Sequence, residues 1–160
     1  MLIGGGMNKL RSIAMILVVL LLSSCSLFGR GGSGAGDDSA EGNIPGPGDY
    51  SILQTVHFAF DSAQITESAK GILSSNADWL KSNSSATVVI EGHCDERGTA
   101  EYNLALGERR ARSVYDYLRS LGVTASQMST ISYGKELPLD PRSNEEAWAK
   151  NRRAQFAVTK

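Results

Sequence analysis

Residues 87–122 read TVVIEGHCDERGTAEYNLALGERRARSVYDYLRSLG, and this stretch decides the fold. Its first four residues, 87–90, include three adjacent apolar side chains, which predicts a strand in the interior of a sheet, covered on both faces. After a polar loop, Thr99 is a suitable N-cap residue, and Glu101 favours the positive first turn of a helix. That helix is expected to end near Gly122, a typical C′ residue. A strand followed by a long helix predicts a helix packed on a sheet.

The sequence on either side of this stretch predicts an α/β domain. Thr66 is expected to cap a second helix that runs to about Ser82, because apolar residues recur there at helical spacing. Ala154, Phe156 and Val158 alternate with smaller or more polar residues, which predicts a strand. Similar patterns predict two more strands at residues 55–60 and 128–133 and a short helix at residues 144–151.

An arginine falls where the long helix should face the core. The predicted apolar stripe of this helix consists of Gly107, Ala111, Val114, Leu118 and Leu121. Arg110 and Asn103 lie on or beside that stripe at 100° per residue, whereas Arg109 and Arg112 point toward solvent. A buried guanidinium needs a carboxylate partner, since an unpaired buried charge is costly. The preceding loop offers Asp95 and Glu96 for this purpose.

Two interpretations of these charges follow. In the first, Asp95 and Arg110 form a structural ion pair that fixes the loop to the helix. In the second, the two charges face a shared ligand that carries both an amine and a carboxylate, such as the end of meso-diaminopimelate in a wall peptide. The residues alone leave both open and favour the ion pair, because charged pairs are more often structural.

Composition narrows the class of protein. The chain has 160 residues, which is enough for one ordinary domain, with 16 basic and 17 acidic side chains. Without the two basic residues of the predicted leader, Lys9 and Arg11, the net charge is about −3. This argues against a general basic surface for nucleic acid. The two cysteines are Cys25 and Cys94, and lipidation of the first would leave no pair for an intrachain disulfide.

The N-terminal residues have the pattern of an export signal. Lys9 and Arg11 precede an unbroken apolar run of ten residues, 13–22, which is too short to span a membrane and suits a signal peptide. Met1 and Met7 are both possible starts. The run ends in Leu-Ser-Ser before Cys25, which resembles the lipobox of bacterial lipoproteins. Residues 1–24 are therefore expected to be a lipoprotein signal peptide and Cys25 the acylated first mature residue. A plain secretory signal with an incidental cysteine is the alternative.

Residues 25–50 are expected to form the lipidated N-terminus and a disordered linker to a domain at residues 51–160. Eight glycines between positions 26 and 49, without apolar periodicity, argue against a packed core there. As a Gly-rich coil of about 25 residues, the linker would span roughly 25–30 Å.

Six segments of the predicted domain match a known family in order and spacing. They resemble the OmpA-like domain family, in particular its peptidoglycan-associated lipoproteins, over about residues 55–160. Ala59 and Cys94 depart from the residues common in the family, namely Asp at the first position and Thr or Ala at the second. The matching segments are residues 56–61, 91–99, 101–103, 106–111, 131–134 and 148–154.

The resemblance implies a two-layer sandwich in which helices pack on a mixed four-stranded sheet. It also implies a non-enzymatic domain without a cofactor or metal that binds peptidoglycan through meso-diaminopimelate. The protein would be anchored in the outer membrane, face the periplasm, and act with TolB and other Tol proteins of the Tol–Pal system in envelope integrity and cell division. The binding residues that the resemblance implies are Asp95, Arg110, Asn103, Asp61 and, more weakly, Arg153.

Other functions have less support from the residues. His93, Cys94 and Asp95 suggest a metal site or a nucleophile, but the chain has only one other histidine, His57, and a zinc site needs about four ligands. Adjacent side chains at a strand end also point opposite ways. A hydrolase or metalloenzyme is therefore the least favoured hypothesis, behind an interaction protein that serves mainly TolB.

Overall fold

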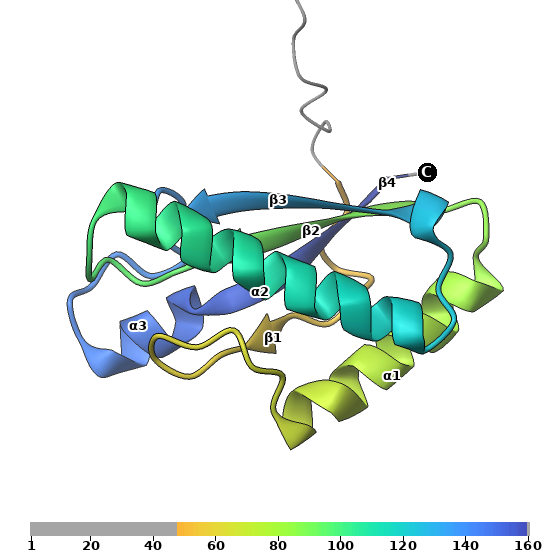
Figure 1. Ribbon diagram of the computed structural model, residues 1–160, viewed down its shortest axis with the longest axis horizontal. Helices are drawn as coiled ribbons and strands as arrows, with labels where there is room; N and C mark the ends of the chain where they lie inside the picture. The colour runs from red at the N-terminus through yellow and green to blue at the C-terminus, as the bar shows by residue number, and fades with distance from the viewer. Residues whose placement is uncertain (1–47, 160) are drawn as a thin grey trace, which may run out of the picture. The chain divides into compact units, whose positions relative to one another are not determined.

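A mixed sheet of four strands organises the part of the chain that the computed structural model describes, residues 48–159. The strand order is β1-β4-β2-β3 (Figure 1). Strands β2 and β3 are parallel, and β4 runs antiparallel to both β1 and β2. The elements in chain order are β1 (Val56–His57), α1 (Glu67–Ser82), β2 (Thr87–His93), α2 (Ala100–Ser120), a 3₁₀ turn (Ala125–Gln127), β3 (Met128–Gly134), α3 (Glu145–Asn151) and β4 (Arg153–Thr159).

The core lies between one face of the sheet and the helices α1 and α2. The register pairs Val88 with Val158 and Ile90 with Phe156, and these four side chains all point into this core. From the helices they meet buried apolar residues that recur at helical spacing, namely Ala69, Leu73, Ala77 and Leu80 of α1 and Ala111, Val114 and Leu118 of α2.

Two glycines bring α2 unusually close to β2. A Cβ atom on Gly92 would lie 1.9 Å from the carbonyl oxygen of Gly107, and one on Gly107 would lie 2.2 Å from the Oγ of Ser132. Only residues without side chains allow this approach. The close contact places the first half of α2 directly against the end of β2, where the loop of residues 94–99 begins.

Most of the predicted elements are confirmed. Thr66 and Thr99 cap α1 and α2, each accepting a hydrogen bond from the backbone N–H three residues on. Gly122 has φ +92° and follows α2 as its C′ residue. The N–H of Val123 donates to Leu118 O, and that of Gly122 to Arg119 O, which completes a Schellman motif.

Two strand ends differ from the prediction by more than one residue, and in both cases it is the C-terminal end of the strand. Strand β2 continues past Ile90 to His93, and β1 comprises two residues where residues 55–60 were expected. The chain leaves the sheet early because side chains, not a neighbouring strand, hold the next carbonyl groups. Arg152 donates to Phe58 O, and Arg110 donates to Ala59 O and Ser62 O.

The predicted signal peptide, Cys25 and the predicted linker as far as residue 47 lie outside the described residues, so these remain predictions. Between residues 48 and 159, no helix is long and apolar enough to cross a membrane.

The close approach of α2 to β2 gives a stability test. Gly107→Ala should lower the free energy of unfolding by about 1–3 kcal/mol, because the added methyl group overlaps the Ser132 hydroxyl and Gly92. The matched control is Gly71→Ala in α1, where nothing lies within 4 Å of the new Cβ. That change should raise stability by about 0.5–1 kcal/mol. Urea unfolding of both variants measures the difference, and equal effects would contradict the packing described here.

Candidate binding site

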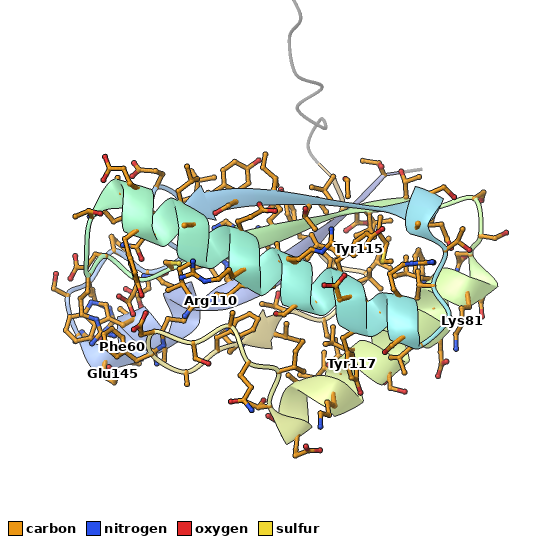
Figure 2. All side chains as sticks on the ribbon, viewed as in Figure 1. Phe60, Lys81, Arg110, Tyr115, Tyr117 and Glu145 are labelled. Carbon is orange, nitrogen blue, oxygen red and sulfur yellow. The ribbon has the colours of Figure 1, made fainter. Side chains whose placement is uncertain are left out.

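A cavity of about 170 Å³ lies where α2 begins. The loop after β1 (residues 58–66), the loop before α2 and the start of α2 all come together at this end of the sheet, close to α3 (Figure 1). In Figure 2, Arg110 points from α2 toward this region, with Phe60 and Glu145 beyond it. The cavity is lined by Phe60, Asp61, Cys94, Asp95, Arg97, Gly98, Tyr102, Asn103, Leu106 and Arg110.

Arg110 is a fully buried cation, with 0% of its surface exposed. Its Nε donates to Ser62 O at 2.8 Å, its first terminal nitrogen to His93 O at 2.8 Å and to Cys94 Sγ at 3.4 Å, and its second to Ala59 O at 3.1 Å. A guanidinium has five N–H donors, so these four bonds leave one donor on the second terminal nitrogen. Burial lowers the pKa of Arg110, although a guanidinium stays charged at neutral pH.

The predicted ion pair between Asp95 and Arg110 is wrong. Within residues 48–159, no carboxylate forms a salt bridge with Arg110. Asp95 pairs instead with Arg97 at 2.7 Å and with Arg152 at 3.5 Å. The reason is that backbone carbonyl groups of the loop after β1 and of the end of β2 bind the Arg110 guanidinium, whereas Arg97 follows Asp95 by two residues and folds back onto it.

Asp95 is itself buried and strongly held. Only 4% of the residue is exposed, and its two oxygens accept from the backbone N–H, the Nε and a terminal nitrogen of Arg97. Burial raises the pKa of this carboxyl, but the hydrogen bonds from Arg97 and its charge outweigh burial, and the pKa lies below its ordinary value. Asp95 is therefore an anion that faces the same cavity as the Arg110 cation.

Asn103 and Asp61, which the family resemblance implied as binding residues, also line the cavity. The buried Asn103 amide donates to Arg97 O at 2.8 Å and to Thr99 O at 3.0 Å, which fixes the loop before α2. Asp61 has φ +51° and accepts a hydrogen bond from the Tyr102 hydroxyl across the mouth of the cavity. Asp61 supplies a second carboxylate to the cavity wall.

Arg97 is held by two aromatic rings, an arrangement that the sequence patterns do not predict. The centre of its guanidinium lies 4.1 Å from the ring centroids of both Phe60 and Trp148. Trp148 donates from its indole nitrogen to Glu96 at 3.0 Å, which orients the ring. The spacing of Asp95 and Arg97 is a signal that the sequence offered, but the two aromatic residues come from distant segments.

Arg153, the weakest of the predicted site residues, does not line the cavity. It lies on the opposite face of the sheet, where its Nε donates to Gln155 at 2.7 Å, and Gln155 in turn donates to Glu91 at 2.8 Å. Its neighbour Arg152 reaches Asp95 instead. Along a strand, adjacent side chains point to opposite faces, so a choice between two consecutive arginines at the start of β4 decides which one approaches the site.

His93 and Cys94 show no arrangement for metal binding or catalysis. His93 is fully buried at 3.6 Å from Glu91 and stacks on Tyr133, and neither of its ring nitrogens has a hydrogen-bond partner among the described residues. Cys94 donates its thiol to Asn103 O, and burial raises its pKa, which weakens it as a nucleophile. In the part of the chain that the structure describes, His, Cys, Asp and Glu form no group of three that could hold a metal ion.

Comparison with known proteins gives a consistent result. The OmpA family model matches residues 57–152. The peptidoglycan-associated lipoprotein of Haemophilus influenzae is 40% identical over 152 residues, which cover 94% of this chain and 99% of that protein. The protein of the same name from Pseudomonas aeruginosa is 42% identical over 125 residues, 78% of this chain and 74% of that protein. These names describe association with peptidoglycan and not catalysis, in agreement with the non-enzymatic expectation.

Solved structures agree with the fold. The crystal structure of the peptidoglycan-associated lipoprotein from Burkholderia pseudomallei matches with a TM-score of 0.64 and 43% identity, over 66% of this chain and 89% of that one. The C-terminal domain of Helicobacter pylori MotB also gives a TM-score of 0.64, at 22% identity, over 68% of this chain and 85% of that one. The second likeness concerns the fold alone.

The buried His93 predicts a pH dependence of stability. Burial lowers the pKa of His93 below its ordinary 6.5, so the folded state binds fewer protons than the unfolded state at mildly acidic pH. The stabilisation is complete above about pH 6.5 and is lost as the pH falls below it, by at most about 1.4 kcal/mol per pH unit. His93→Phe should flatten the change in unfolding free energy between pH 7.5 and 5 measured by urea titration. Burial also lowers the pKa of His57, so His57→Gln measures the contribution of that second histidine separately. An unchanged slope in His93→Phe would refute this assignment.

Proposed function

The chain belongs to the OmpA family, and on this premise we propose that its described domain binds peptidoglycan, without catalysis, through the meso-diaminopimelate of the stem peptide. The observation that carries the proposal is a buried cation, Arg110, and a buried anion, Asp95, that line one cavity without pairing with each other. Two buried opposite charges that do not pair with each other suit a guest that carries both an ammonium and a carboxylate group.

The size of the cavity and the charged residues in its wall support a small zwitterion. Its volume of about 170 Å³ is well above the roughly 10–15 Å³ that a single water molecule needs. The end of diaminopimelate beyond its methylene chain has five heavy atoms, namely a nitrogen, the attached carbon and a carboxylate group. The remaining Arg110 donor would bind the carboxylate, and Asp95 would bind the ammonium, both as charge-assisted hydrogen bonds. Leu106 would pack against the methylene chain.

The cellular setting of the proposal comes from the relatives. Proteins named peptidoglycan-associated lipoprotein match nearly the whole chain, including the segment with the lipobox pattern. We therefore propose an acylated Cys25 in the outer membrane, a Gly-rich linker, and a domain that faces the periplasm and holds the membrane to the wall. TolB and other Tol proteins are the proposed protein partners, with a role in envelope integrity and cell division.

Co-sedimentation with purified sacculi tests the binding site. Asp95→Asn and Arg110→Gln should each weaken retention of the domain on diaminopimelate-containing sacculi by about thirtyfold or more, because each removes one charge that the guest would need. Circular dichroism and thermal unfolding must show that both variants remain folded. The matched controls are Asp116→Asn and Arg112→Gln, which remove an exposed pair at 3.1 Å on the outer face of α2 and should bind normally.

Two results would contradict the proposal. One is normal retention of both folded site variants. The other is equal binding of the unmodified domain to sacculi whose stem peptides carry lysine in place of diaminopimelate, since lysine lacks the second carboxylate that Arg110 is proposed to hold.

A further inference from the structure

We propose that Arg97 is a built-in occupant of the cation subsite, which a ligand ammonium must displace before it can bind Asp95. This inference rests on the proposed function, because it concerns how the same site admits its ligand. In this proposal Arg97 binds neither of the two ligand charges. Its role is to decide which ligands gain access to Asp95.

Asp95 has no vacant acceptor position. A carboxylate offers about four lone-pair positions on its two oxygens. The oxygen Oδ1 accepts from the backbone N–H of Arg97 at 3.2 Å and from its Nε at 3.1 Å. The oxygen Oδ2 accepts from a terminal nitrogen of Arg97 at 2.7 Å and from Arg152 at 3.5 Å. A ligand ammonium can therefore bind Asp95 only if one of these donors leaves.

Of the two arginines that bind Asp95, Arg97 is the one that can leave. Arg152 is held in place by Phe58 O at 3.1 Å and Glu145 at 2.8 Å, and only 9% of its side chain is exposed. The Arg97 side chain is 32% exposed, and apart from Asp95 its guanidinium contacts the faces of Phe60 and Trp148. Rotation of Arg97 into solvent gives up the two ring contacts but breaks no other hydrogen bond of its guanidinium, whereas rotation of Arg152 would.

The exchange of Arg97 for a ligand ammonium on Asp95 selects the ligand. Displacement of the Arg97 side chain removes two charge-assisted bonds from a buried anion, and only another cation with several N–H donors replaces them. A ligand with a carboxylate alone can reach Arg110 but leaves Asp95 covered. An N-acetylated amine also fails, because it has lost its charge. Arg97 therefore makes the site respond to a zwitterion and reject a simple anion.

The chain contains a matched control for this arrangement. Asp140 and Arg142 repeat the same spacing, and Asp140 accepts from the backbone N–H of Arg142 at 3.2 Å, from its Nε at 2.9 Å and from a terminal nitrogen at 2.6 Å. This second pair, Asp140 and Arg142, does not line the cavity at the start of α2. Arg142→Ala removes the same kind of fork without removing a residue that lines the proposed subsite.

Calorimetry with the tripeptide L-Ala-D-Glu-meso-diaminopimelate tests the inference. Apparent affinity falls with the fraction of molecules in the open state, so occupancy by Arg97 in about nine-tenths of molecules predicts roughly a tenfold gain in Arg97→Ala. Arg142→Ala should bind like the unmodified domain, and Arg97→Lys, a point charge without the fork, should fall between. Weaker or equal binding by a folded Arg97→Ala would overturn the proposal.

Ethylguanidinium provides a second measurement that does not depend on the proposed function. In Arg97→Ala the free ethylguanidinium should occupy the position that the Arg97 side chain has vacated. It should shift the NMR resonance of the Asp95 amide in a saturable way. It should also cancel the gain in tripeptide affinity. The unmodified domain and Arg142→Ala should show no such shift at Asp95. If the tripeptide binds to none of the proteins while ethylguanidinium still shifts Asp95 in Arg97→Ala, the proposed function fails and the occupancy by Arg97 stands. Absence of that shift in Arg97→Ala overturns the occupancy.

Discussion

The guanidinium of Arg110, buried on α2 without a carboxylate partner in residues 48–159, holds the functional end of the domain together. Its hydrogen bonds reach the end of β2 through His93 O and the loop after β1 through Ala59 O and Ser62 O. Three segments that are distant in sequence are thereby fixed around one cavity. A charge in this position is expensive to bury, and the proposed ligand carboxylate would supply the missing anion.

The glycine contact between α2 and β2 makes this arrangement possible. Because Gly92 and Gly107 bring the two backbones together, the side chain of Arg110, three residues further along α2, reaches His93 O at the end of β2. Asp95 is positioned by the loop that leaves β2, and Arg97 and Arg152 neutralise it in the absence of a guest. The site thus combines a rigid cation with an anion whose partner can be exchanged.

Much of the fold was predictable from local patterns. The caps at Thr66 and Thr99 and the C′ residue Gly122 depend on nearby residues alone, and all three are confirmed. The burial of Arg110 was also predictable, because helical periodicity placed it on the apolar stripe. Its partners were not, since they are backbone carbonyl groups of distant loops. The short β1 depends on the same long-range contacts to carbonyl groups. The choice between Arg152 and Arg153 depends on which face of β4 each side chain occupies, and it is Arg152 that approaches Asp95.

The central claim is that opposite charges in one cavity receive the two charges of a single guest. A crystal structure of the domain with L-Ala-D-Glu-meso-diaminopimelate tests this most directly. The account predicts the ligand carboxylate within hydrogen-bond distance of Arg110, its ammonium on Asp95, and the Arg97 guanidinium turned out toward solvent. A tripeptide bound elsewhere on the domain, or bound in the cavity with the fork between Arg97 and Asp95 intact, would contradict it.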